Sequence, residues 1–354
     1  MKPGDEERGA PGPSHGTGLT GGFRLATVDG PTPVAATSGS IRLGRLFGVP
    51  ELGLLAMLLA ASAAFTLINP GFASATNIES LFRTVVFTGI VVVGEALLLM
   101  VGEFDLSVGS VAGMGAIVAG LLIAQVGWPI PLAMLGGILA GGAVGLVNGV
   151  VTAKVGLPAF VTTLSMLFVA RGIAYVLSGG DPVYPLPAGV GVLARTDILG
   201  IPSSIWIFLA LVVIADQAMR RTTWGRIVYS TGGSVRTSRL AGIDTARVKI
   251  GAFVITGALA AFAGVMLMSR LGRADPSFGL GWELNVIAAA VVGGVRLGGG
   301  SGTILGAFLG LLFLQVIAQG LVIAGVDASL QPVVIGVVMI TAVGIDLSRR
   351  RRYG

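Results

Sequence analysis

The sequence predicts an all-α integral membrane protein with about ten transmembrane helices. Of the 354 residues, 54% are hydrophobic and only 11% are charged, whereas a soluble domain carries about 25% charged residues because its surface faces water. The mean hydropathy is +0.91. The apolar residues also come in runs of about 20, the length that a helix needs to cross a bilayer.

The predicted spans follow one another from residue 50 to the C-terminal end, and the sixth and eighth are short or interrupted by glycine. They cover residues 50–68, 84–101, 107–126, 129–152, 158–178, 202–219, 250–269, 284–296, 302–324 and 329–347.

Composition divides the chain into three parts. Residues 1–45 are rich in Gly, Pro, Ser and Thr and are expected to form a disordered tail. Residues 46–348 form the transmembrane domain, and residues 349–354 are a basic C-terminal end. The loop 220–249 is rich in Arg and Lys, and such loops stay in the cytoplasm. An even number of spans then places both termini in the cytoplasm as well.

Several classes of chemistry are excluded. The chain has no cysteine and a single histidine, His15 in the tail, so we expect no thiolate catalysis, no metal site and no resident cofactor. No P-loop motif is present, so any ATP would be bound by another polypeptide. The net charge of +6 fits cytoplasmic helix ends and does not indicate nucleic acid.

An internal repeat indicates two related halves. Val101–Ser110 aligns without a gap with Val292–Ser301, and Val, Gly, Leu, Gly and Ser coincide. Each copy ends one apolar span, breaks and starts another, as in transporters built from two repeats with irregular backbone lining the path. Chance similarity between glycine-rich segments remains an alternative.

Glycines recur every four residues in the fourth predicted span, at Gly137, Gly141, Gly145 and Gly149. They share one face of the helix, so we expect a neighbouring helix to approach that face closely.

Polar side chains inside or between spans are candidates for the translocation path, because burying them in a membrane is costly. They are Glu95, Glu103, Asp105, Ser107, Asn148, Thr162, Thr163, Arg171 and Asn285. Two structural alternatives stay open. Glu95 could pair with Arg171 and hold the bundle together. Asp105 or Ser107 could cap the helix that begins near Val108.

A short capped helix is predicted within the basic loop. Ser234 is a suitable N-cap and Gly242 a suitable stop, with roughly two helical turns between them. Val235, Leu240 and Ile243 would supply apolar contacts. This helix could dock a cytoplasmic partner, or it could rest on lipid headgroups through its arginines.

Three passages of the sequence resemble the permeases of bacterial ATP-binding-cassette (ABC) importers for monosaccharides, the ribose, xylose, arabinose and galactose group. The first is Gly102–Gly109, read as Gly-x-x-Asp-Leu-Ser-Val-Gly. The second is Leu157–Leu164, continued by Ala170–Gly172. The third runs from Thr223 through Arg239–Ile243 to Lys249. The resemblance covers residues 50–347.

This resemblance implies a homodimer of permeases in the bacterial cytoplasmic membrane, docked on two ATPase subunits. An extracytoplasmic sugar-binding protein would deliver the solute, and ATP hydrolysis on the partner would drive alternating access. The chain itself would not be an enzyme. The coupling helix would comprise Ser234, Val235, Arg236, Thr237, Ser238, Arg239, Leu240, Ala241, Gly242 and Ile243. The family often has Asn at the position of Ser234 and Ala at those of Arg236 and Thr237, which leaves the details of the ATPase contact open.

Other functions remain to be weighed. An ion-driven carrier would use Glu95 or Asp105 as a proton site and would need no partner at the basic loop. A related permease could carry branched-chain amino acids. A membrane enzyme is disfavoured because no catalytic group accompanies the two carboxylates. The solute could be a pentose, a hexose, a polyol or a furanose-like signalling molecule.

Overall fold

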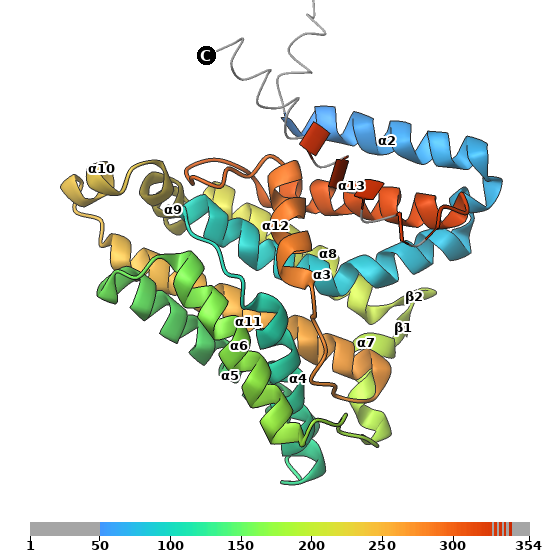
Figure 1. Ribbon diagram of the computed structural model, residues 1–354, viewed down its shortest axis with the longest axis horizontal. Helices are drawn as coiled ribbons and strands as arrows, with labels where there is room; N and C mark the ends of the chain where they lie inside the picture. The colour runs from blue at the N-terminus through green and yellow to red at the C-terminus, as the bar shows by residue number, and fades with distance from the viewer. Residues whose placement is uncertain (1–49, 328, 331–332, 335, 338–339, 342–354) are drawn as a thin grey trace, which may run out of the picture. The chain divides into compact units, whose positions relative to one another are not determined.

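The computed structural model describes residues 50–327, 329–330, 333–334, 336–337 and 340–341 (Figure 1). The expected tail and basic end lie outside these residues, so the three-part domain division stays a prediction. Most of the predicted span at 329–347 also lies outside them.

The described part of the chain is largely helical, and seven of its helices are long and apolar enough to cross a membrane. They are α2 (Pro50–Ile68), α3 (Ala75–Val101), α5 (Ile130–Val150, extended by a π-helical turn at Val151–Val155), α6 (Ala159–Ser178), α8 (Ser203–Arg221), α11 (Thr245–Leu271) and α13 (Ile304–Ile323). Two apolar helices are shorter, α4 (Val108–Ala124) and α12 (Trp282–Val292). The all-α membrane class is confirmed, whereas the count of ten spans is not.

Helix α12 is shorter than the span predicted at 284–296. Its 11 residues rise about 16 Å, while the hydrocarbon core of a bilayer is about 30 Å thick. The helix ends because Gly293 and Gly294 follow it, and Gly294 has a φ of 89° in the left-handed region. Helix α12 is therefore a half-length element inside the bundle.

Short elements connect the spans. They are η1 (Pro70–Ala73), η3 (Ala188–Gly191), α7 (Val192–Arg195), strands β1 (Asp197–Ile198) and β2 (Ile201–Pro202), α9 (Thr223–Gly233) and α10 (Val235–Leu240). The two strands form an antiparallel hairpin that the sequence analysis did not predict. Its turn residues Leu199 and Gly200 both have positive φ, 57° and 79°, as a tight two-residue hairpin turn requires.

Helix α3 forms the centre of the bundle. Its N-cap is Ser74, whose hydroxyl accepts a hydrogen bond from the amide of Asn77, so the helix begins earlier than the predicted residue 84. Almost every side chain from Val85 to Val101 is buried. A helix that is apolar all round must be covered on all sides, and α8, α11, α12 and α13 supply this cover (Figure 1).

The glycine face of α5 is confirmed as a helix contact. A Cβ atom on Gly145 would lie 2.2 Å from the carbonyl oxygen of Phe253, and one on Gly141 would lie 2.4 Å from that of Gly257. Both carbonyls belong to α11. Glycine at these positions lets the backbones of α5 and α11 touch.

We expect Gly145→Ala to destabilise the bundle by about 1–3 kcal/mol, because the added methyl group overpacks the contact between α5 and α11. The measurement is thermal unfolding of the purified chain in mild detergent. The matched control is Gly172→Ala on α6, where a Cβ would meet nothing within 4 Å. There the better helix propensity of Ala should raise the stability by at most about 1 kcal/mol. Equal melting temperatures for the two variants would contradict the packing argument.

Candidate functional site

The polypeptide breaks between α3 and α4 where the first copy of the repeat was predicted. Gly102 ends α3 with a φ of 92°, and α4 begins at Val108. Neither Asp105 nor Ser107 caps α4 as expected, because Asp105 Oδ1 accepts from the amide of Ser107, one residue before the helix, at 2.7 Å. Within the described structure the Ser107 side chain makes no hydrogen bond to the amides of α4.

A buried polar cluster surrounds this break. The amide of Asp105 donates to Glu95 Oε1 at 3.0 Å, and the Ser107 hydroxyl donates to Asp105 Oδ1 at 2.6 Å. From α5, Asn148 Nδ2 lies 3.2 Å from Asp105 Oδ2 and 3.1 Å from the Ser107 hydroxyl. All four side chains are at most 1% exposed. The cluster therefore ties the break to α3 and α5.

Two atoms of this cluster have no hydrogen-bond partner among the described residues, Glu95 Oε2 and Asn148 Oδ1. A buried polar group without a partner costs free energy. A rearrangement that gave these two atoms hydrogen-bond partners would therefore stabilise the cluster.

Glu103, the next candidate residue, pairs with Lys249 at the start of α11. Both side chains are largely buried, 14% and 20% exposed, which strengthens their attraction compared with a surface pair. The partner was not predicted, because Lys249 was read as one of many cytoplasmic charges. The pair connects the break to the helix that follows the basic loop.

The remaining candidates lie apart from this cluster. Arg171 on α6 donates to the carbonyl oxygens of Pro276 and Phe278, the latter at 2.8 Å, and no ion pair joins it to Glu95 in the described chain. The alternative of a Glu95–Arg171 pair is therefore wrong. Arg171 fastens the segment between α11 and α12 to α6.

The threonines and Asn285 do not join the cluster either. The Thr163 hydroxyl donates to the Ala159 carbonyl within α6 at 2.8 Å, and the Thr162 hydroxyl has no partner among the described residues. Asn285 lies exposed on α12 and donates to Gly281 O at 3.1 Å. Their role in the translocation path stays a prediction.

The second copy of the repeat is also a break, but a longer one. Val292 ends α12 as Val101 ends α3, whereas α13 starts only at Ile304 after its N-cap Thr303. Two adjacent glycines of this break lie in the left-handed region, with φ of 82° at Gly299 and 77° at Gly300.

The two breaks meet each other and the end of α9 at one point, the glycine junction. We use this name for Met100, Gly102, Gly232, Gly299 and Gly300. The Gly300 amide donates to the Met100 carbonyl at 2.9 Å. A Cβ on Gly232 would lie 1.9 Å from that same carbonyl oxygen and 2.5 Å from the Gly300 nitrogen. Three backbones can converge here only because Gly232 has no side chain.

Tyr229 adds a second link between α9 and the second break. Its hydroxyl donates to the Gly302 carbonyl at 2.9 Å. Burial raises the pKa of Tyr229, so the phenol stays protonated and remains a donor. Sequence analysis missed this residue and the junction, and the glycine pair at 232–233 was the signal that could have led to them.

The short helix predicted in the basic loop is present as α10, which has six residues. The Ser234 hydroxyl accepts from the Thr237 amide at 3.2 Å. Gly242 has a φ of 82°, and Asp244 caps α11 through the amides of Ala246 and Arg247. These local caps agree with the prediction.

The apolar residues of this helix differ in their surroundings. Leu240 is 83% exposed, whereas Ile243 is half-buried and packs on the core. Ser238 is buried and its hydroxyl lies 2.9 Å from that of Ser230 on α9. Helix α10 is thus held to α9 by one face and presents Leu240 and its arginines outward.

Comparison with known proteins gives consistent matches over most of the chain. A family described as the permease component of branched-chain amino acid transport systems matches residues 77–343. The L-arabinose ABC transporter permease protein AraH of Azospirillum brasilense is 35% identical over 323 residues, which cover 91% of this chain and 95% of that protein.

Two further relatives have similar coverage. The ribose import permease protein RbsC of Escherichia coli K12 is 33% identical over 302 residues, 82% of this chain and 92% of the relative. The autoinducer 2 import system permease protein LsrC of Salmonella paratyphi B is 34% identical over 279 residues, 79% and 80% of the two chains. No solved structure matches the chain.

We expect Asp105→Asn to destabilise the chain by about 1.5–3 kcal/mol, because the new amide group would face the amide of Asn148 and charge-assisted hydrogen bonds are lost. The double variant Asp105→Asn with Asn148→Asp restores a donor opposite an acceptor and should recover about half of the loss. Thermal unfolding in detergent measures both. A double variant no more stable than Asp105→Asn would contradict the hydrogen-bond assignment.

Proposed function

Since the chain belongs to the permease family of ABC importers, and to its monosaccharide group, we propose that it carries a monosaccharide or a similar small polar solute across the cytoplasmic membrane by alternating access. It is a multi-pass protein of the bacterial inner membrane. In the proposed assembly two copies of the chain dock on two separate ATPase subunits, and an extracytoplasmic sugar-binding protein delivers the solute. Both termini and α10 face the cytoplasm.

The observation that carries the proposal is the connection from α10 to both breaks. Helix α10 exposes an apolar residue, Leu240, that nothing in the described chain covers, as expected for a docking element. Its N-cap Ser234 follows Gly232 and Gly233, and Gly232 touches Met100 and Gly300. A force applied to α10 by an ATPase would therefore reach the two places where the spans are interrupted.

In this account the buried cluster positions the first break and does not contact the solute in the state seen here. Glu95, Asp105 and Asn148 are closed off from solvent, and a solute can meet only groups that are accessible.

Relatives guide the choice of solute to test. AraH and RbsC are named for arabinose and ribose, both five-carbon sugars, whereas the family description names branched-chain amino acids. We propose a pentose. The test is uptake of labelled L-arabinose and ribose, with labelled leucine measured in parallel. Cells that lack the transporter are compared with cells to which the complete system has been restored. Restored uptake of leucine alone would favour the amino acid permease.

We expect Leu240→Asp to reduce co-purification of the ATPase by about tenfold or more, as for an apolar hot spot replaced at an interface. Melting temperature should not change, since Leu240 is exposed. Leu199→Asp is the matched control, because Leu199 is 90% exposed in the β1–β2 hairpin, which belongs to an extracytoplasmic loop in the proposed topology. Undiminished ATPase recovery with Leu240→Asp would remove the coupling assignment, and recovery of the wild-type chain alone would favour a self-contained carrier.

We expect Gly232→Ala to lower solute uptake by about tenfold or more while the ATPase still co-purifies, because the added methyl group forces the junction apart and weakens the coupling. Gly233→Ala controls for this change, since a Cβ on Gly233 would meet nothing within 4 Å. If both variants transport like the wild type, the junction does not transmit motion.

A further inference from the structure

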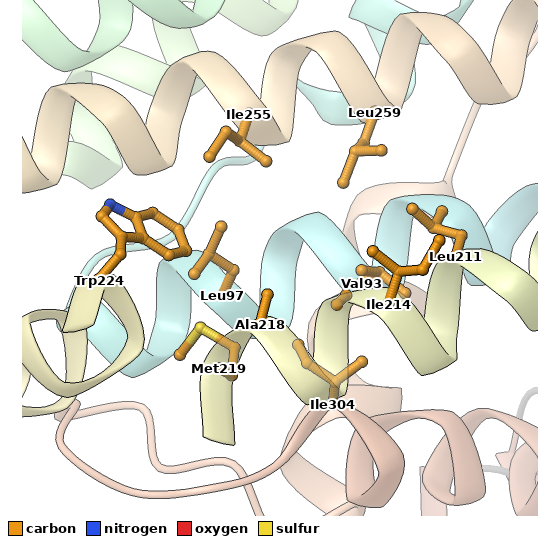
Figure 2. Close-up of a pocket in the computed structure, with 11 residues that line it drawn as sticks. Val93, Leu97, Leu211, Ile214, Ala218, Met219, Trp224, Ile255, Leu259 and Ile304 are labelled. Carbon is orange, nitrogen blue, oxygen red and sulfur yellow. The ribbon is translucent and has the colours of Figure 1, made fainter. Parts of the chain in front are cut away.

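An apolar groove of about 210 Å³ lies between α8 and α11 (Figure 2). Val93 and Leu97 of α3 form its floor, and Ile255 and Leu259 of α11 point toward them. Only Val, Leu, Ile, Ala, Met and Trp side chains line it. A sugar would find almost no hydrogen-bond partner here and would lose its hydration, so the groove does not serve as a solute path.

The groove runs along one face of α8. Leu211, Ile214, Ala215 and Ala218 line it at the three- and four-residue spacing of a helix face, and Arg221 takes the next position on that face. From Leu211 to Met219, the last residue of α8 that lines the groove, the helix rises about 12 Å, and Arg221 lies about 3 Å farther along. The groove and Arg221 together therefore cover about 15 Å, half of the roughly 30 Å hydrocarbon core of a bilayer. This is the length of the acyl region of one leaflet.

The end of the groove near Arg221 carries free hydrogen-bond donors. Arg221 is exposed and has no ion pair within the described chain, although its neighbour Arg220 pairs with Asp216 at 2.7 Å. Trp224 closes this end, and its indole nitrogen points away from the other groove side chains (Figure 2). No hydrogen bond to that nitrogen occurs among the residues described.

We propose that this groove is a binding site for one anionic phospholipid of the cytoplasmic leaflet. One acyl chain lies between α8 and α11, and the headgroup phosphate accepts hydrogen bonds from the guanidinium of Arg221, which matches phosphate geometry. Trp224 sits at the level of the headgroups, where tryptophan is enriched. The assignment to the cytoplasmic leaflet, which is rich in anionic lipids, rests on the orientation given under the proposed function.

Native mass spectrometry of the full chain in mild detergent tests the site, with dioleoyl phosphatidylglycerol and dioleoyl phosphatidylcholine as probes. The wild type should retain one phosphatidylglycerol per chain and prefer it by about fivefold. Arg221→Gln should abolish this preference and leave binding of phosphatidylcholine unchanged. Ala215→Trp should fill the groove and reduce binding of both lipids.

Two controls separate these effects from general damage. Val213→Trp changes an exposed residue of α8 that does not line the groove. Arg273→Gln removes a charge just beyond the other end of α11, where Arg273 pairs with Asp275 at 3.5 Å. Both should bind lipid like the wild type. Equal binding of the two lipids by the wild type, or wild-type binding by both Arg221→Gln and Ala215→Trp, would overturn the proposal.

A second copy of the chain is the competing occupant of the groove. Conversion of a dimer to a monomer by Ala215→Trp, without loss of bound phosphatidylglycerol, would overturn the lipid site in favour of that occupant. Capture of the ATPase through α10 is measured separately. Lost ATPase capture with intact lipid preference therefore counts against the proposed function alone, and the reverse result counts against the lipid site alone.

Discussion

Gly232 makes one of the closest backbone contacts among the described residues, since any side chain there would collide with the Met100 carbonyl and the Gly300 amide, which hydrogen-bond to each other at 2.9 Å. Direct contact between backbones leaves almost no room to slide, because the interior of a protein transmits displacement instead of absorbing it. The end of α3, the second break and the end of α9 are therefore held together at one place. A family relationship identifies the chain as an importer permease, and this contact suggests how such a chain could respond to a partner on its cytoplasmic side.

The buried polar cluster of Glu95, Asp105, Ser107 and Asn148 is less completely bonded than the glycine junction. Asp105 is held by the Ser107 amide, the Ser107 hydroxyl and Asn148, yet one oxygen each of Glu95 and Asn148 remains unpaired among the described residues. Polar networks in an apolar surrounding stabilise a single arrangement when every group is satisfied, and a partly satisfied network is costly. The first break thus combines a close backbone contact at its start with a partly satisfied polar centre. In the proposed alternating access the contact would be the fixed connection to the ATPase, and the polar centre would be the place that changes between states.

The sequence predicted features that depend on neighbouring residues. Ser234, Gly242 and Asp244 are local caps, so α10 was found with its boundaries nearly correct, and the glycine spacing of α5 indicated the contact with α11. What it could not predict depends on residues far apart in the chain. The junction joins residues near 100, 232 and 300, and Glu103 and Lys249 lie 146 residues apart in the sequence. Repeat alignment matched the helix ends at Val101 and Val292 but not the length of the second break, because glycine positions alone do not show where a helix resumes.

Distances between spin labels test most directly whether α10 and the breaks move as one body. The chain has no cysteine, so spin labels can be attached to cysteines introduced two at a time. The exposed positions are Arg236 on α10, Leu297 in the second break and Leu199 in the hairpin. In the complex with the ATPase, addition of a non-hydrolysable ATP analogue should leave the distance between 236 and 297 unchanged. The distances from both positions to 199 should shift together. A change between 236 and 297, with 297 to 199 constant, would show that α10 moves alone and would contradict the account.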